Sequence, residues 1–166
     1  MKFSSVILSL LALSACSYYN IFNRDDVRDT AKISDIELSS MSATKAYEIA
    51  ATRITNKLLD DSADIYEAKP NTKLYIKKIQ KNSETLPDGF YNAQKSMREI
   101  ISGSGTYTVV DKIEDADFIL TSKVSELKNN NQPIIIFNTD ILDKQEKPVK
   151  SWSVTIRQMP EDKSWW

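Results

Sequence analysis

The first sixteen residues, MKFSSVILSLLALSAC, constrain the fold of this chain more than any other segment. Lys2 precedes a short apolar run over 6–13, and small residues then lead into Cys16, the only cysteine. This order is the anatomy of a secretory signal that ends at a cleavage site. A chain with a single cysteine forms no intramolecular disulfide, so the part that follows must fold on a hydrophobic core alone.

The run Leu13-Ser14-Ala15-Cys16 resembles the lipobox of bacterial lipoproteins. The resemblance implies cleavage between Ala15 and Cys16, a thioether-linked diacylglycerol on Cys16, and acylation of the new amino terminus. Two or three acyl chains hold a protein durably on a membrane, whereas one chain is marginal. Ser17 stands where lipoproteins retained at the inner membrane tend to carry Asp, which implies the outer membrane of a Gram-negative cell.

Two other interpretations of this segment fit less well. An uncleaved membrane anchor needs about 20 apolar residues, and the run over 6–13 is too short. An ordinary cleaved signal would leave Cys16 as a lone free thiol in an oxidising compartment. We therefore expect an anchored protein that does not span the membrane.

Four parts follow from this interpretation: a lipoprotein signal peptide at 1–15, a lipidated tether at 16–41, a periplasmic domain at 42–158 and a tryptophan-containing tail at 159–166. The tether is predicted because residues 17–41 keep neither a helical nor a strand period and are rich in charge, Ser, Asn and Asp. Its Tyr18, Tyr19 and Phe22 either touch the lipid interface, where aromatic rings are favoured, or are plain linker residues.

The composition excludes several classes of function. The chain has 22 basic and 23 acidic side chains, and loss of Lys2 with the signal leaves a net charge near −2. A nucleic-acid-binding domain would need a basic face. Histidine, the commonest general base and metal ligand, is absent, and Cys16 is committed to lipid. We expect no nucleic-acid partner, metal, cofactor, small-molecule substrate or catalytic activity.

One catalytic motif nevertheless occurs, because SATK at 42–45 matches the S-x-x-K of penicillin-interacting serine enzymes. The companion K-T-G is absent, and the Ser-Asp pair at 34–35 lacks its Asn. Ser42 is explained more simply as the N-cap of a helix. Adjacent acidic pairs stand at 25–26, 60–61 and 161–162, where we expect solvated carboxylates.

Two segments carry the 3.6-residue apolar period of an amphipathic helix. The first covers 43–63, with Ser42 as its N-cap. The second begins after Asp88, predicted as its N-cap, and is stopped by Gly103 and Gly105. Their apolar stripes are Tyr47, Ala50, Ala51, Ile54 and Leu58 in the first helix and Phe90, Ala93, Met97, Ile100 and Ile101 in the second.

Alternating or β-branched runs predict strands over 73–79, 106–110, 117–127, 134–142 and 152–157. The last three follow one another through short polar turns, which predicts an antiparallel meander. The earlier strand–helix–strand unit needs a crossover that places its helix on one sheet face. The fold class is therefore α+β: a two-layer sandwich with a mixed, mainly antiparallel sheet of about five strands and two helices on one face.

Three stretches resemble the outer-membrane lipoproteins that activate penicillin-binding proteins, the Lpo activator family of the B type, and the N-terminal domain of TolB is similar. FYNAQKSMREIISGSGTYTVVD resembles the family's helix, stop and strand, and ADFILTSKVSEL resembles its strand entry. TDILDKQEKPVKSWSVTIRQ resembles its hairpin ending in Trp-Ser. The resemblance covers roughly 43–158. The chain departs from the family by having only residues 112–115 where one or two helices are usual, and by its short linker without a proline-rich stretch.

Two surfaces are candidates for contact with a partner. Trp165 and Trp166 either anchor an interface, as exposed tryptophans often do, or fold back over the domain, because large apolar groups rarely stay bare. The sheet face opposite the helices either docks a partner or faces water. It is predicted to carry Ile119, Thr121, Lys123, Thr155 and Arg157.

The sequence thus predicts an outer-membrane lipoprotein whose periplasmic domain binds an envelope protein. The resemblance implies a peptidoglycan synthase of the penicillin-binding-protein type as that partner. The alternative is a structural subunit of an envelope secretion or assembly complex. A hydrolase or a carrier of a small ligand is a third, weaker hypothesis.

Overall fold

The computed structural model describes residues 30–38, 42–69, 71–86, 88–129 and 132–158. Within these ranges the elements, in chain order, are β1 (Thr30–Leu38), α1 (Ala43–Asp61), α2 (Ala63–Ala68), β2 (Lys73–Ile76), β3 (Gln80–Lys81), α3 (Phe90–Ser104), β4 (Thr108–Val110), the short 3-10 helix η1 (Ile113–Asp115), β5 (Phe118–Asn129), β6 (Gln132–Leu142) and β7 (Pro148–Gln158). Cys16, Trp165 and Trp166 lie outside the described residues.

The strands form one mixed sheet in the order β1-β7-β6-β5-β2-β4, and β3 pairs with β5 beyond the end of β2. β5, β6 and β7 are the predicted antiparallel meander and make the longest ladders, whereas β1 joins β7 in parallel and β2 lies parallel between β4 and β5. The predicted fold class is confirmed, with seven strands among the described residues instead of about five.

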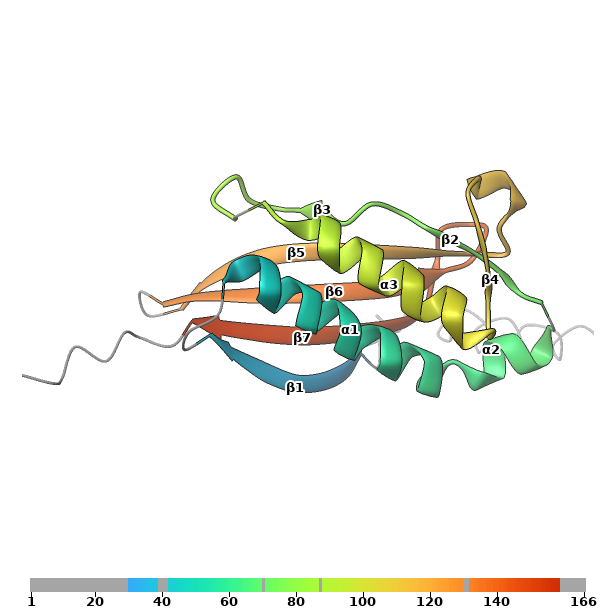
Figure 1. The fold of residues 1–166 in the computed structure, drawn as a ribbon, viewed down its shortest axis with the longest axis horizontal. Coiled ribbons are helices and arrows are strands. Elements are labelled where there is room, and N and C mark those ends of the chain that lie inside the picture. Colours follow the sequence, from blue (N-terminus) through green and yellow to red (C-terminus); the bar gives the residue numbers. More distant parts are fainter. Residues whose placement is uncertain (1–29, 39–41, 70, 87, 130–131, 159–166) are drawn as a thin grey trace, which may run out of the picture.

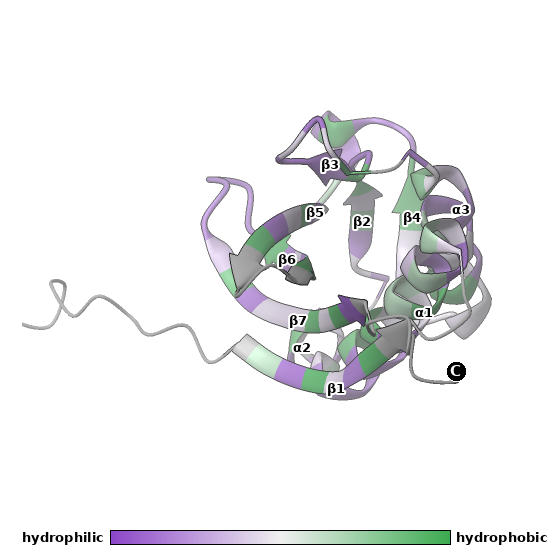
Figure 2. Cartoon of the chain, turned by 90° about the vertical axis from the view of Figure 1, so that its left-hand side faces the viewer, coloured by the Kyte–Doolittle hydropathy of each residue, from purple (hydrophilic) through white to green (hydrophobic). Residues whose placement is uncertain are grey.

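Both long helices pack on one side of the curved sheet (Figures 1 and 2). They run in the same direction because each leads from one parallel strand back towards the start of another. Both predicted stripes face the core, where Tyr47 and Met97 are fully buried, and the Tyr47 and Phe90 rings stack at 4.7 Å. Phe137, Trp152 and Val154 are the facing residues from the sheet. Burial of both stripes against the meander is therefore what holds the two layers together.

The predicted tether is wrong in its second half, because residues 30–38 are strand β1 and belong to the domain. Ala31, Ile33 and Ile36 pair with Trp152, Val154 and Ile156 of β7. The register shifts between Ile33 and Ile36, a bulge that is tied to α1 by Arg53, which donates to the carbonyl oxygens of Ser34 and Asp35.

The predicted ends of the second helix also differ from the structure. Asp88 is not its N-cap, since Gly89 takes that position with φ 137° and the Asp88 carboxylate instead accepts from Lys81 Nζ at 2.9 Å. A Cβ on Gly89 would lie 2.4 Å from the Thr44 hydroxyl, so the close approach of α3 to α1 requires glycine. Gly103 lies inside α3, and only Gly105 ends it, in the left-handed conformation.

One contact joins the end of α1 to β7, the strand next to the edge strand β1. The buried indole of Trp152 donates from Nε1 to Asp61 Oδ2 at 3.1 Å, and Lys57 Nζ donates to Asp61 Oδ1 at 2.7 Å. The hydrogen bond from Lys57 holds the pKa of the Asp61 carboxyl below its ordinary value. Lys150 donates to the Asp61 carbonyl oxygen and to the Asp64 carboxylate, both at 2.5 Å.

The Trp152–Asp61 contact generates a stability prediction. Asp61→Ala should lower the free energy of unfolding by about 2 kcal/mol, because it leaves a buried indole N–H without an acceptor. Asp60→Ala is the matched control, since this neighbouring side chain is exposed and should change stability by less than about 0.5 kcal/mol. Urea unfolding followed by tryptophan fluorescence measures both, and equal losses would contradict the assigned role of Asp61.

Two buried tyrosines make a second matched pair. Burial raises the pKa of both, but Tyr107 donates to Ser62 Oγ at 2.8 Å, whereas the Tyr47 hydroxyl has no hydrogen-bond partner among the described residues. Tyr107→Phe should cost about 1 kcal/mol of stability, and Tyr47→Phe should be neutral or stabilising. Urea unfolding again provides the measurement. A loss in Tyr47→Phe as large as that in Tyr107→Phe would reveal a partner for the Tyr47 hydroxyl.

Candidate functional site

The S-x-x-K match is a helix cap. Ser42 Oγ accepts from the Lys45 backbone N–H at 3.3 Å, as predicted for an N-cap, and Lys45 Nζ pairs with Glu48 at 3.1 Å on the surface of α1. The side chains of the motif are therefore occupied by local contacts of the helix. Among the described residues, no group of three Asp or Glu side chains is placed to hold a metal ion.

The two acidic side chains at 60–61 lie in different environments. Asp60 is exposed, as expected of a solvated carboxylate, whereas Asp61 is held by Lys57 and Trp152. The prediction of solvated carboxylates is therefore wrong for Asp61, because the end of α1 lies directly over β7. The arrangement is that of a helix–sheet contact, in which each carboxylate oxygen already accepts one hydrogen bond.

The remaining candidate is the sheet face turned away from α1 and α3, called the open face below. It consists of the side chains of β2, β5, β6, β7 and β1 that alternate away from the core, and no helix lies over its β5–β1 part (Figure 2). The structure places the five predicted residues there: Ile119, Thr121, Lys123, Thr155 and Arg157.

Two of those five are already engaged. Arg157 Nε pairs with Asp35 in the bulge of β1 at 2.8 Å, so its charge is partly satisfied. Ile119 is only 5% exposed although it lies outside the main core cluster. Its neighbours across the sheet are Tyr75 of β2 and Leu142 of β6, which extend an apolar row over three strands.

An ion pair spans this apolar row. Lys77, just after β2, and Glu146, in the β6–β7 turn, meet at 3.0 Å although β5 lies between β2 and β6. Glu146 has a positive φ of 59°, which belongs to the tight turn that places it there. This end of the open face is therefore closed by a polar bridge over a small apolar cluster.

The middle of the open face is a polar row that the sequence did not reveal. Lys123 of β5 pairs in register with Asn138 of β6, Asn138 with Ser153 of β7, and Ser153 with Lys32 of β1. Strands lie about 4.8 Å apart, so the two lysines are about 14 Å apart with an amide and a hydroxyl between them. Lys32 was missed because it falls in the segment predicted as a tether.

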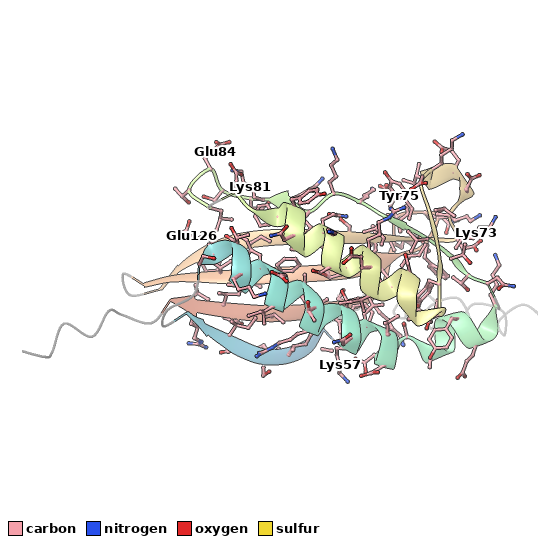
Figure 3. The ribbon with its side chains drawn as sticks, in the orientation of Figure 1. Lys57, Lys73, Tyr75, Lys81, Glu84 and Glu126 are labelled. Atoms are coloured by element: carbon pink, nitrogen blue, oxygen red, sulfur yellow. The ribbon has the colours of Figure 1, made fainter. Side chains whose placement is uncertain are left out.

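Charge on the open face is unevenly satisfied. Of the described acidic side chains there, Asp35 is ion-paired with Arg157 and Glu146 with Lys77, whereas Asp140 accepts only from the neutral Ser151 hydroxyl. By contrast, Lys32, Lys73 and Lys123 are exposed and form no ion pair with another described residue. Figure 3 shows Lys73 and Tyr75 on β2, with Lys73 at the end of the molecule opposite Lys81 and Glu126. The described side chains of the face therefore carry an excess of positive charge, with three unpaired lysines against the Asp140 carboxylate.

Within the described ranges, no helix has both the length and the apolar character needed to cross a membrane.

Comparison with known proteins gives structural likenesses only. No protein-family model matches the chain, and no curated protein sequence matches it. The structure is similar to the LpoB C-terminal domain from Escherichia coli, with 13% identity and a TM-score of 0.47 over 66% of this chain and 96% of that one. It is also similar to the LpoB C-terminal domain from Salmonella enterica, with 14% identity and a TM-score of 0.44 over 68% and 98%. A PelC dodecamer from Paraburkholderia phytofirmans shares 15% identity, with a TM-score of 0.37 over 52% and 72%.

Proposed function

We propose that this chain is an outer-membrane lipoprotein whose periplasmic domain is a binding module for an envelope protein, and that the partner is a peptidoglycan synthase which the domain activates. The observation that carries the proposal is the ending of the signal-like segment, Leu-Ser-Ala, at the only cysteine of the chain. Lipid on Cys16 would hold the domain at the membrane surface. The role of the domain would then be to bind an envelope protein close to the membrane.

The partner class comes from the three stretches that resemble the B-type Lpo activators. In the structure, 90–111 forms α3 and the strand β4, 116–127 covers most of β5, and 139–158 forms the end of β6, the turn and β7. Each stretch therefore adopts the kind of element that the resemblance implies. This agreement supports the fold expectation, and the activator role is inferred from it by analogy.

The departures from that family limit the reach of the domain. The β4–β5 connection holds only η1, and the segment available as a tether ends at Thr30 instead of residue 41. Thirteen residues, 17–29, then separate Cys16 from the domain. Even fully extended they span about 45 Å. The proposed partner must therefore present its contact surface close to the membrane.

A structural subunit of an envelope complex is the second candidate, and one observation favours it. β1 pairs with β7 on one side only, so its other edge is open among the described strands. Open strand edges pair readily with other chains. Self-assembly through β1 would build a ring or filament instead of an activator complex.

Lipidation has a direct test. Cells grown with an alkyne fatty acid should label the wild-type protein, and Cys16→Ala should abolish labelling because the thioether sulfur is gone. Ser17→Ala is the matched control and should label normally. Mass spectrometry of the mature protein should find the acyl groups on Cys16. Labelling that persists in Cys16→Ala would rule out the proposed anchor.

Crosslinking in intact cells separates the two candidate functions. A photoreactive residue at Tyr91 on α3 or at Leu127 on β5, exposed by 77% and 51%, samples both sides of the domain. We expect capture of a peptidoglycan synthase from at least one position. Capture of only further copies of the chain would favour the structural subunit and overturn the activator role.

A further inference from the structure

We propose that the open face rests on an anionic phospholipid surface, which its unpaired lysines and hydrogen-bonding side chains recognise. The inference depends on the lipidation of Cys16 proposed above. It adds an orientation: the sheet faces the bilayer and the helices face away from it. Protein partners would then meet the domain from the side of α1 and α3.

Proximity is the first step. The tether joins the domain at Thr30, the first residue of the edge strand β1, and Thr30 pairs with Ser151 of β7. Lys32 follows only two residues later, about 7 Å along the strand. A thirteen-residue tether therefore holds the β1 edge of the sheet, where the polar row begins at Lys32, nearest to the bilayer.

Charge complementarity is the second step. Lys32, Lys73 and Lys123 are exposed on one face and form no ion pair with another described residue. Of the described acidic groups there, Asp35 and Glu146 are ion-paired and Asp140 is hydrogen-bonded to Ser151. Each lysine near an anionic bilayer shifts binding about fivefold. The whole chain has formal charge −1, so the attraction arises from this segregation of charge and not from net charge.

The side chains between the lysines suit a headgroup layer. Asn138 and Ser153 lie in the row itself and form no side-chain hydrogen bond with another described residue, which leaves an amide and a hydroxyl for phosphate oxygens. Ile134 and Ile136 are half-buried at one end of the face, and Tyr75 lies at the other. A tyrosine with an apolar body and a polar tip is favoured at the membrane interface.

The affinity that the docking needs is small. Once lipid on Cys16 is inserted, contact between the open face and the bilayer is intramolecular. A short tether gives this contact an effective concentration in the millimolar range. A surface interaction too weak to recruit the free domain is then sufficient to orient the anchored one.

The test uses the lipidated protein in vesicles of phosphatidylcholine, with or without phosphatidylglycerol. Because Cys16 carries lipid, an introduced cysteine is the only free thiol. Thr155→Cys places it on the open face, and Asn92→Cys places it on exposed α3 as the control. The measurement is the rate of labelling by a neutral, water-soluble maleimide. Flotation confirms that each variant is bound to vesicles, and circular dichroism confirms that it is folded.

We expect Thr155→Cys to react about tenfold more slowly in anionic than in neutral vesicles, and Asn92→Cys to react equally in both. High salt, with a Debye length of about 3 Å at 1 M, should remove the protection. Adding Lys32→Glu and Lys123→Glu to Thr155→Cys should restore fast labelling, since two lysines account for about a 25-fold shift. Lys45→Glu with Lys95→Glu, the same charge change on α1 and α3, should leave the protection intact.

Several results would overturn the docking. These are equal labelling of Thr155→Cys in both vesicle types, protection that survives the charge reversal, protection of Asn92→Cys instead, or protection that appears only when a protein partner is added. The docking and the anchor fail separately. Missing acyl groups on Cys16 would refute the lipoprotein itself, whereas a lipidated protein with a freely reactive open face would refute only its orientation.

Discussion

The contact between the Trp152 indole and the Asp61 carboxylate fixes where α1 lies on the sheet, while burial of the helix stripes holds the two layers together. An acidic side chain at the C-terminal end of a helix opposes the helix dipole, so Asp61 needs compensation, and it receives it from Trp152, Lys57 and Lys150. Trp152 stands on β7, between β1 and β6, and pairs in register with Ala31 and Thr139. Fixing the end of α1 on this strand sets the position of α1 along the sheet. The Tyr47–Phe90 stack then sets α3 beside α1, and with it the crossover from β2 to β4.

The parts of the fold that the sequence predicts are those with an uninterrupted period. Both helical stripes and the meander are buried on one side only, so their patterns of 3.6 and 2 residues survive in the sequence. β1 escaped prediction because its bulge moves the inward residues from Ala31 and Ile33 to Ile36, which breaks the alternation. β3 has two exposed residues and carries no pattern at all. The displaced cap of α3 has a different cause, since the close contact of Gly89 with Thr44 is tertiary and cannot be read from the segment itself.

The candidate site was predictable strand by strand but not as a surface. Alternation alone assigns Thr121, Lys123 and Thr155 to the outer face, and the structure agrees. The row that joins Lys123 to Lys32 depends on the register of four strands and includes one that the sequence concealed. The Lys77–Glu146 bridge likewise depends on a turn that reverses the chain at a positive φ. Composition and periodicity therefore do not predict those surfaces of a β-sheet protein that depend on the register between its strands.

Placing β1 in the domain also changes what lipid on Cys16 would mean. A tether of 25 residues, 17–41, would allow the domain to lie far from the bilayer, whereas 13 residues could span at most about 45 Å even when fully extended. At that separation the surface of the domain would be close enough to the bilayer to be attracted to it or repelled by it. A face with bound carboxylates and free lysines is favoured beside anionic headgroups, and one with free carboxylates is repelled from them. The exposed acids Asp60 and Glu99 lie on α1 and α3, on the side of the sheet opposite the open face. The same charge segregation that would draw the sheet to lipid would therefore turn these elements, with Tyr91 of α3, towards whatever protein the domain binds.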